Sequence, residues 1–158
     1  MTEKQTLLEV REREFTTTLK VLRAFPKNKE SFKPHERSRS AGELAFTLAI
    51  EEMINVQAAE GVVDFQKLSQ DMPKTMDEII FLLEKNHAEA TQAITATSEE
   101  DINKTLKFGT MNLRRIDVMW FMLFDTIHHR GQFSVYIRMA GGKVPSIYGP
   151  SADDPGDM

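Results

Sequence analysis

The chain has 158 residues, no cysteine, a formal net charge of −4 at pH 7 and a sequence pI near 5.6. Its length suits one ordinary domain with a substantial core, so we expect a single domain over residues 1–158. The lack of cysteine excludes disulfides, thiolate catalysis and cysteine-based zinc sites, and the acidic balance without a clustered basic stripe argues against nucleic-acid binding.

Neither the N-terminus nor the longest apolar run has the features of export or membrane insertion. The stretch MTEKQTLLEVREREF lacks the apolar core of a signal peptide. The run VMWFMLF, residues 118–124, is far shorter than the roughly 20 residues that span a bilayer. We therefore predict a soluble, cytoplasmic protein with no membrane partner.

The first two predicted helices lie on either side of a polar loop. The first carries an apolar stripe and ends at Pro26; the stripe consists of Leu8, Phe15, Leu19 and Leu22. Ser38 or Ser40 is expected to cap the second helix, which runs over about residues 41–60, because a serine hydroxyl satisfies first-turn amides. Gly61 is a natural end for it.

The third and fourth predicted helices complete the pattern. The third follows Pro73 and has one apolar face, made of Met76, Ile79, Leu83, His87, Ala90 and Ile94. The fourth runs over about residues 112–140, is apolar nearly all round at its middle and ends at two glycines. We find no alternating strand pattern, and we expect residues 143–158, which are rich in proline, to form an irregular C-terminal arm packed through Ile147 and Tyr148.

Four long helices in one small domain predict an all-α four-helix bundle, whose sites are built from inward-facing side chains of neighbouring helices. The connection between the first two helices is long, about 15 residues. Adjacent helices therefore need not be the antiparallel neighbours that short loops require.

Asp125 and His129 are the first candidates for chemistry. They are four residues apart on the fourth helix, so they share a face and can reach one ligand, and both suit divalent first-row metals. The structural alternative is a hydrogen bond between the two, or pairing of Asp125 with an arginine: Arg114, Arg115 or Arg130.

Two neighbours of this pair have other expected roles. His128 points about 100° away from His129 on the helix wheel, which predicts a surface, interface or supporting position. Gly131 costs about 1 kcal/mol within a helix relative to alanine, so we expect it to permit close approach of another helix.

The second helix offers Thr47 and Glu51, again four residues apart. Thr47 has a structural alternative too, since a helical threonine commonly bonds the carbonyl of residue i−4. Of Glu51 and Glu52 we expect one to be exposed and the other free to face a cavity. We interpret His87 as a hydrogen-bonded core residue. Whether Glu51 or His87 completes a metal site stays open.

Two stretches resemble a known family. The segments HHRGQFSVYIRMAGGKVPSIYGPSADD and PHERSRSAGELAFTLAIEE are similar to the corresponding regions of the DinB family, and with the helix layout the resemblance covers essentially the whole chain. It implies a DinB/YfiT-like bundle in up-down-down-up order. Because dimers are common in the family, it also implies a homodimer.

The resemblance further implies a metal site of three histidines, one from the second helix and two at i, i+4 on the fourth. Carried onto this chain, those positions are Thr47, Asp125 and His129, so only one histidine is retained. The implied cofactor is one divalent ion (Ni, Zn, Fe or Mn), and the implied activity is that of a metal-dependent hydrolase or thiol transferase. The alternative is a metal-free, degenerate relative that binds a small molecule or a protein partner.

Overall fold

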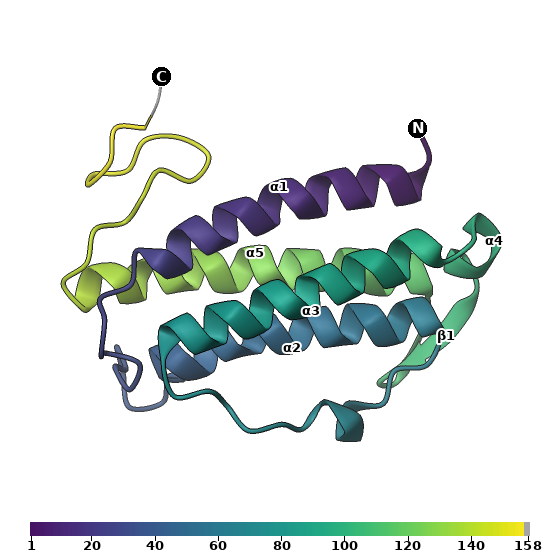
Figure 1. The fold of residues 1–158 in the computed structure, drawn as a ribbon, viewed down its shortest axis with the longest axis horizontal. Coiled ribbons are helices and arrows are strands. Elements are labelled where there is room, and N and C mark those ends of the chain that lie inside the picture. Colours follow the sequence, from purple (N-terminus) through teal and green to yellow (C-terminus); the bar gives the residue numbers. More distant parts are fainter. Residues whose placement is uncertain (157–158) are drawn as a thin grey trace.

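The computed structural model describes residues 1–156 and contains a bundle of four long helices (Figure 1). This confirms the predicted all-α four-helix bundle. The four helices are α1 (Glu3–Arg23), α2 (Ala41–Glu60), α3 (Met76–Ala96) and α5 (Arg115–Met139). Helix α2 packs against both α3 and α5, and α1 packs against the same two helices.

The bundle has the up-down-down-up order. Helices α2 and α3 run in the same direction, and α1 and α5 run in the opposite one (Figure 1). Residues 61–75 connect the end of α2 to the start of α3, and they run back along the bundle to the end at which α2 begins (Figure 1). This connection contains one short 3₁₀ helix, η1 (Phe65–Leu68). A connection of this length is what two parallel neighbours need.

The helix boundaries follow local capping signals. Thr2, Ser40 and Thr75 each accept a bond from the backbone N–H three residues later, and the side chain at that position bonds back to the cap. At the other end of α2, Gly61 has φ 93°, a left-handed conformation that favours glycine. The predicted bounds of the second helix and the start of the third are therefore confirmed.

The expectation of no strands is wrong. Strands β1 (Thr105–Phe108) and β2 (Met111–Arg114) form an antiparallel hairpin, and the short helix α4 (Glu99–Ile102) precedes it. The tight turn places Gly109 at φ 59°. Each strand has only four residues, which is too few for a clear alternation in the sequence. Because β2 occupies residues 111–114, the last helix begins at Arg115 rather than near residue 112.

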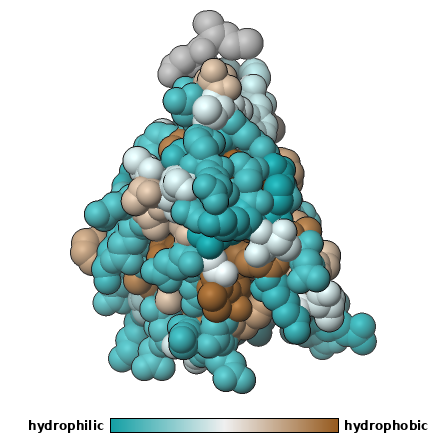
Figure 2. All heavy atoms as spheres, turned by 90° about the vertical axis from the view of Figure 1, so that its right-hand side faces the viewer, coloured by the Kyte–Doolittle hydropathy of each residue, from teal (hydrophilic) through white to brown (hydrophobic). Residues whose placement is uncertain are grey.

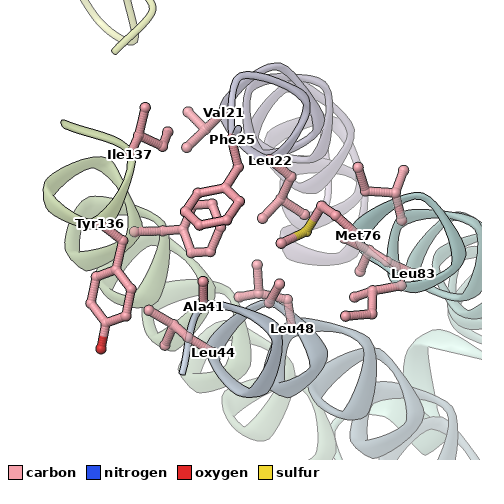
Figure 3. Packing of buried hydrophobic residues seen from close by; sticks show 14 of the residues in the cluster. Val21, Leu22, Phe25, Ala41, Leu44, Leu48, Met76, Leu83, Tyr136 and Ile137 are labelled. Carbon is pink, nitrogen blue, oxygen red and sulfur yellow. The ribbon is translucent and has the colours of Figure 1, made fainter. Parts of the chain in front are cut away.

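The core runs along the inside of the bundle in two clusters. Figure 3 shows part of the first, to which all four long helices contribute side chains, including Leu22, Leu48, Leu83 and Tyr136. The second cluster lies around Ile94, Ile116 and Met119 and includes residues of the hairpin. The surface at the hairpin end is mostly hydrophilic (Figure 2). Over the residues described, no helix combines the length and the apolar character that crossing a bilayer requires.

The segment after α5 is irregular, as predicted, up to residue 156; residues 157 and 158 of the predicted arm lie outside the described part. Ile147 packs against the first core cluster. The Tyr148 ring is mostly exposed, but its hydroxyl donates a 2.6 Å hydrogen bond to Glu14 of α1. The arm therefore contacts the bundle through both residues expected.

Candidate metal centre

Helices α2 and α5 bring three metal-ligating side chains together. The ligand atoms of Glu51, Asp125 and His129 lie within 4.8 Å of one another. We call these three residues the metal cluster. His129 Nδ1 is 2.7 Å from a carboxylate oxygen of Glu51, and His129 Nε2 is 3.9 Å from one of Asp125. The cluster therefore bridges two helices that lie far apart in the sequence.

The metal cluster opens to solvent on one side. The side chain of Glu51 is 4% exposed, that of His129 13% and that of Asp125 37%. Thr126 closes the inner side, where its hydroxyl donates a 2.6 Å hydrogen bond to the second oxygen of Glu51. Asp125 is thus the most exposed ligand of the cluster.

Burial and pairing shift both buried groups of the cluster. Burial raises the pKa of Glu51, although hydrogen bonds from His129 and Thr126 oppose the rise. The hydrogen bond to Glu51 raises the pKa of His129, and the nearby charge of Arg39 works against that rise. Both shifts favour the protonated forms, so protons and an incoming cation would compete for this pair.

The geometry and chemistry of the cluster fit a divalent ion. Ligand atoms about 2.1 Å from one ion lie at most about 4.2 Å from each other, so small side-chain shifts suffice to close the cluster. Carboxylate oxygen and imidazole nitrogen are suitable donors.

Thr47 lies one turn before Glu51 on α2 but makes different contacts. Its hydroxyl donates to the Glu43 carbonyl at 2.9 Å and accepts a bond from Arg39 Nη1 at 3.0 Å. The first contact is the i−4 bond expected as its structural alternative. A ligand role for Thr47 stays a prediction, while Glu51 contributes the carboxylate from α2.

The structural alternatives for Asp125 are not realised. Its distance of 3.9 Å from His129 is too long for a hydrogen bond. The three candidate arginines bond elsewhere: Arg114 to Asp117, Arg115 to the Ala59 carbonyl and Arg130 to Glu14. Asp125 is therefore held only loosely by protein groups.

His87 belongs to a second polar group on the other side of α2. Its Nδ1 lies 2.9 Å from Glu52, and its ring stacks on Phe15 at 3.6 Å between centroids. Arg11 of α1 donates to the same carboxylate at 2.6 Å. His87 is thus a hydrogen-bonded core residue, as predicted, and does not join the metal cluster.

The expectation that one of Glu51 and Glu52 is exposed is wrong, because both are buried. Helix α2 has packed neighbours on two sides, so each glutamate finds its own partners. Burial by itself raises the pKa of Glu52, but the charge of Arg11 and the contact with His87 outweigh it and bring that pKa to about 2.

Two neighbours of His129 take up different positions. His128 is exposed, in agreement with its predicted surface position. The interpretation of Gly131 is wrong: a Cβ at this residue would have no atom within 4 Å, so no helix approaches it closely. Arg130 is 2% exposed and pairs with Glu14 at 2.7 Å.

Polar networks also include residues that no sequence pattern indicated: Thr126, Arg39 and the Glu14–Arg130 pair. Thr126 directly follows Asp125, but nothing local indicates that its hydroxyl reaches Glu51 on another helix. Arg39 lies in the polar loop before α2, where no local pattern distinguishes it from the other basic residues.

Comparison with known proteins gives one family match and related structures. A model described as DinB family matches residues 1–156. The uncharacterized protein YrdA of Bacillus subtilis (strain 168) is 28% identical over 94 residues, which cover 57% of this chain and 56% of YrdA, so the match spans about half of that relative.

Two crystal structures share the fold. A DinB-like protein of Bacillus cereus ATCC 10987 has a TM-score of 0.79 at 18% identity, with 91% of this chain and 97% of that one covered. A DinB-like protein of Bacillus subtilis, YjoA, has a TM-score of 0.71 at 18% identity, with 86% and 92% covered.

Proposed function

This chain belongs to the DinB family, and on that premise we propose that it binds one divalent metal ion through Glu51, Asp125 and His129. The convergence of the three ligand atoms within 4.8 Å carries the proposal. We further propose that the bound ion serves a metal-dependent hydrolase or thiol transferase. Thr47, one turn before Glu51, would then lie beside the ion rather than complete its ligand set.

The residues of such a site would have different roles. A divalent ion in this position supplies Lewis acidity, which lowers the pKa of a water or thiol nucleophile towards neutrality. Glu51 and His129 hold the buried side, and the hydroxyl of Thr126 fixes the orientation of Glu51. Asp125 lies on the side open to solvent, from which a substrate arrives.

The donor set favours particular ions. Two carboxylates and one imidazole are harder ligands than the three imidazoles that the family resemblance implies. Carboxylates suit Mn²⁺, and imidazole suits Fe²⁺, Zn²⁺ and Ni²⁺. All four ions therefore stay candidates, and the two carboxylates make this site better suited to Mn²⁺ than a site of three imidazoles.

Metal content tests the proposal directly. Protein purified without chelator should contain about one metal ion per chain by elemental analysis, and His129→Ala should weaken binding at least about 10-fold because it removes a ligand. His128→Ala is the matched control, since this neighbour is exposed and outside the cluster. Folded wild-type protein that takes up none of the four ions would refute the proposal.

A second candidate function is a metal-free relative that binds a small molecule or a protein partner. One observation favours it: His129 and Thr126 already satisfy Glu51, so the buried carboxylate is stable without an ion. Thr47 in place of the second-helix histidine points the same way.

Restoring that histidine separates the two candidates. If the site has lost its metal, Thr47→His should convert weak or absent metal binding into tight binding, by at least about 10-fold in titration calorimetry, because it adds an imidazole one turn from Glu51. Thr95→His, at an exposed position of α3, is the control for an added histidine. An unchanged affinity would show that Thr47 does not correspond to a ligand position.

The family resemblance also predicts a homodimer. Light scattering on the purified chain measures its mass in solution, and a mass near 36 kDa, about twice the 18.0 kDa of one chain, would support the dimer.

A further inference from the structure

Arg39 is fixed at both ends beside the metal cluster. Its backbone carbonyl accepts a 3.0 Å hydrogen bond from the hydroxyl of Tyr136, a buried residue of α5. Its Nη1 atom donates a 3.0 Å bond to the Thr47 hydroxyl on α2. Arg39 therefore bridges the two helices that carry the metal ligands.

Both anchor points lie on the faces that carry the cluster. Thr47 is four residues before Glu51 on α2, and Tyr136 is seven residues after His129 on α5. Residues at these spacings lie one above the other on a helix. The guanidinium is thus held about one helical turn from Glu51, along the same seam between α2 and α5.

The Arg39 guanidinium makes one hydrogen bond among the described residues, so most of its N–H donors have no protein partner. Within residues 1–156, the buried Arg11 and Arg130 are paired with glutamates, whereas no carboxylate oxygen lies within 4.0 Å of the Arg39 guanidinium. Glu43, on the first turn of α2, instead accepts from the Ser40 N–H at 2.6 Å. Arg39 is exposed and bonds only a neutral hydroxyl, so most of its five N–H donors stay available.

The charges around the seam favour an anion. The two carboxylates of the cluster balance a divalent ion, and Arg39 adds one positive charge next to them. A planar guanidinium matches the paired oxygens of a carboxylate or phosphate in two-point contact. An oxyanion that reaches the ion can therefore also contact Arg39, whose guanidinium lies about one helical turn from Glu51 along the same seam.

We propose that Arg39 is the anion-recognition residue of the site and that the substrate is a small molecule carrying a carboxylate or phosphate group. This inference rests on the proposed metal function. Arg39 binds the oxyanion and positions the rest of the substrate at the ion, so it determines specificity without being a metal ligand.

Anion titrations of the Co²⁺-loaded protein test the inference. The visible absorption of bound Co²⁺ reports changes at the ion, and acetate and inorganic phosphate serve as separate probes. We expect at least one of them to change the wild-type spectrum saturably, and Arg39→Gln to weaken that anion at least about 10-fold, the effect of losing a charged contact. The better probe identifies the substrate group as carboxylate or phosphate.

Three variants make the test specific. Arg39→Gln removes a positive charge near the cluster, so its Co²⁺ affinity should be equal to or higher than that of wild type, and its thermal unfolding should be close to wild type because Arg39 is exposed. Arg39→Lys should retain part of the anion affinity. Arg37→Gln, two residues away in the same exposed loop, should change nothing.

The two ways of failing are distinguishable. Wild-type protein that takes up neither Co²⁺ nor any of the four proposed ions would refute the metal proposal, and the anion proposal with it. Normal Co²⁺ binding would refute the anion inference alone if neither anion changes the spectrum, or if both bind equally well to wild type and Arg39→Gln.

Discussion

Glu51 is a carboxylate with almost no contact with water, and its surroundings explain how the site responds to pH. Both of its oxygens accept hydrogen bonds, one from Thr126 and one from His129. A buried carboxylate stabilises a positive charge beside it, whether a protonated imidazole or a metal ion. Protons and metal ions therefore compete at His129.

Glu51→Gln tests this coupling. The amide carries no charge, so the variant loses the cause that raises the pKa of His129, and the ring should titrate at lower pH than in wild type. NMR titration of the His129 ring signals measures the difference, with the exposed His128 as internal reference. Equal midpoints in the two proteins would contradict the coupling.

The same coupling determines the sign of the pH dependence of metal binding. Below its raised pKa, His129 is protonated and cannot ligate an ion, so wild-type metal affinity should increase as the pH rises through that pKa. Calorimetric titrations at several pH values measure this increase.

At the scale of single elements, helix boundaries and helix interiors place opposite demands on glycine. Gly61 ends α2 in a left-handed conformation, and a Cβ there would lie 2.3 Å from the Arg115 guanidinium. Gly131 lies inside α5, and a Cβ there would meet open space. The same substitution should therefore have opposite effects at the two positions.

Gly131→Ala should stabilise the protein by about 0.5–1 kcal/mol, because alanine loses less backbone entropy in a helix. Gly61→Ala should destabilise it by about 1–2 kcal/mol through left-handed strain. Urea unfolding of both variants and of wild type measures the two changes in the free energy of unfolding. A destabilised Gly131→Ala would show that α5 is approached closely at that point after all.

At the scale of the whole molecule, Glu52 links three helices through charged contacts. It lies on α2, accepts from Arg11 of α1 and contacts His87 of α3. Its carboxylate must be ionised for these contacts to hold, and its pKa of about 2 lies below the ordinary 4.5. The link is therefore sensitive to acid.

A lowered carboxyl pKa stabilises the folded state above the unfolded pKa, and this stability is lost as the pH falls through the folded one. Wild type should lose about 3 kcal/mol more than Glu52→Gln between about pH 4.5 and 2, the equivalent of this shift. Urea unfolding across this range measures the difference.

Glu12→Gln is the matched control for this measurement. Glu12 contacts the other nitrogen of His87 at 3.3 Å, but its side chain is 67% exposed. The variant should keep the acid-sensitive loss of wild type. Parallel curves for wild type and Glu52→Gln would rule out the role assigned to Glu52.

The sequence by itself determined the helices and their order of appearance. Periodic apolar residues, the serine and threonine caps and Gly61 all act within about one helical turn, so the bounds of α2 and the start of α3 could be predicted closely. The His-Arg-Gly-Gln segment and the tail added the family resemblance. The two strands could not be predicted, because four residues are too few to show a clear alternation of apolar and polar side chains.

Only the tertiary structure decided which polar residues act together. Spacing on one helix placed Asp125 and His129 on a common face, but it could not show that Glu51 meets His129 or that Glu52 meets Arg11. The burial of a charge depends on partners from other helices, and no local pattern encodes them. For the same reason Arg39, whose anchors are Thr47 and Tyr136, looked like an ordinary loop residue until the two helices were placed side by side.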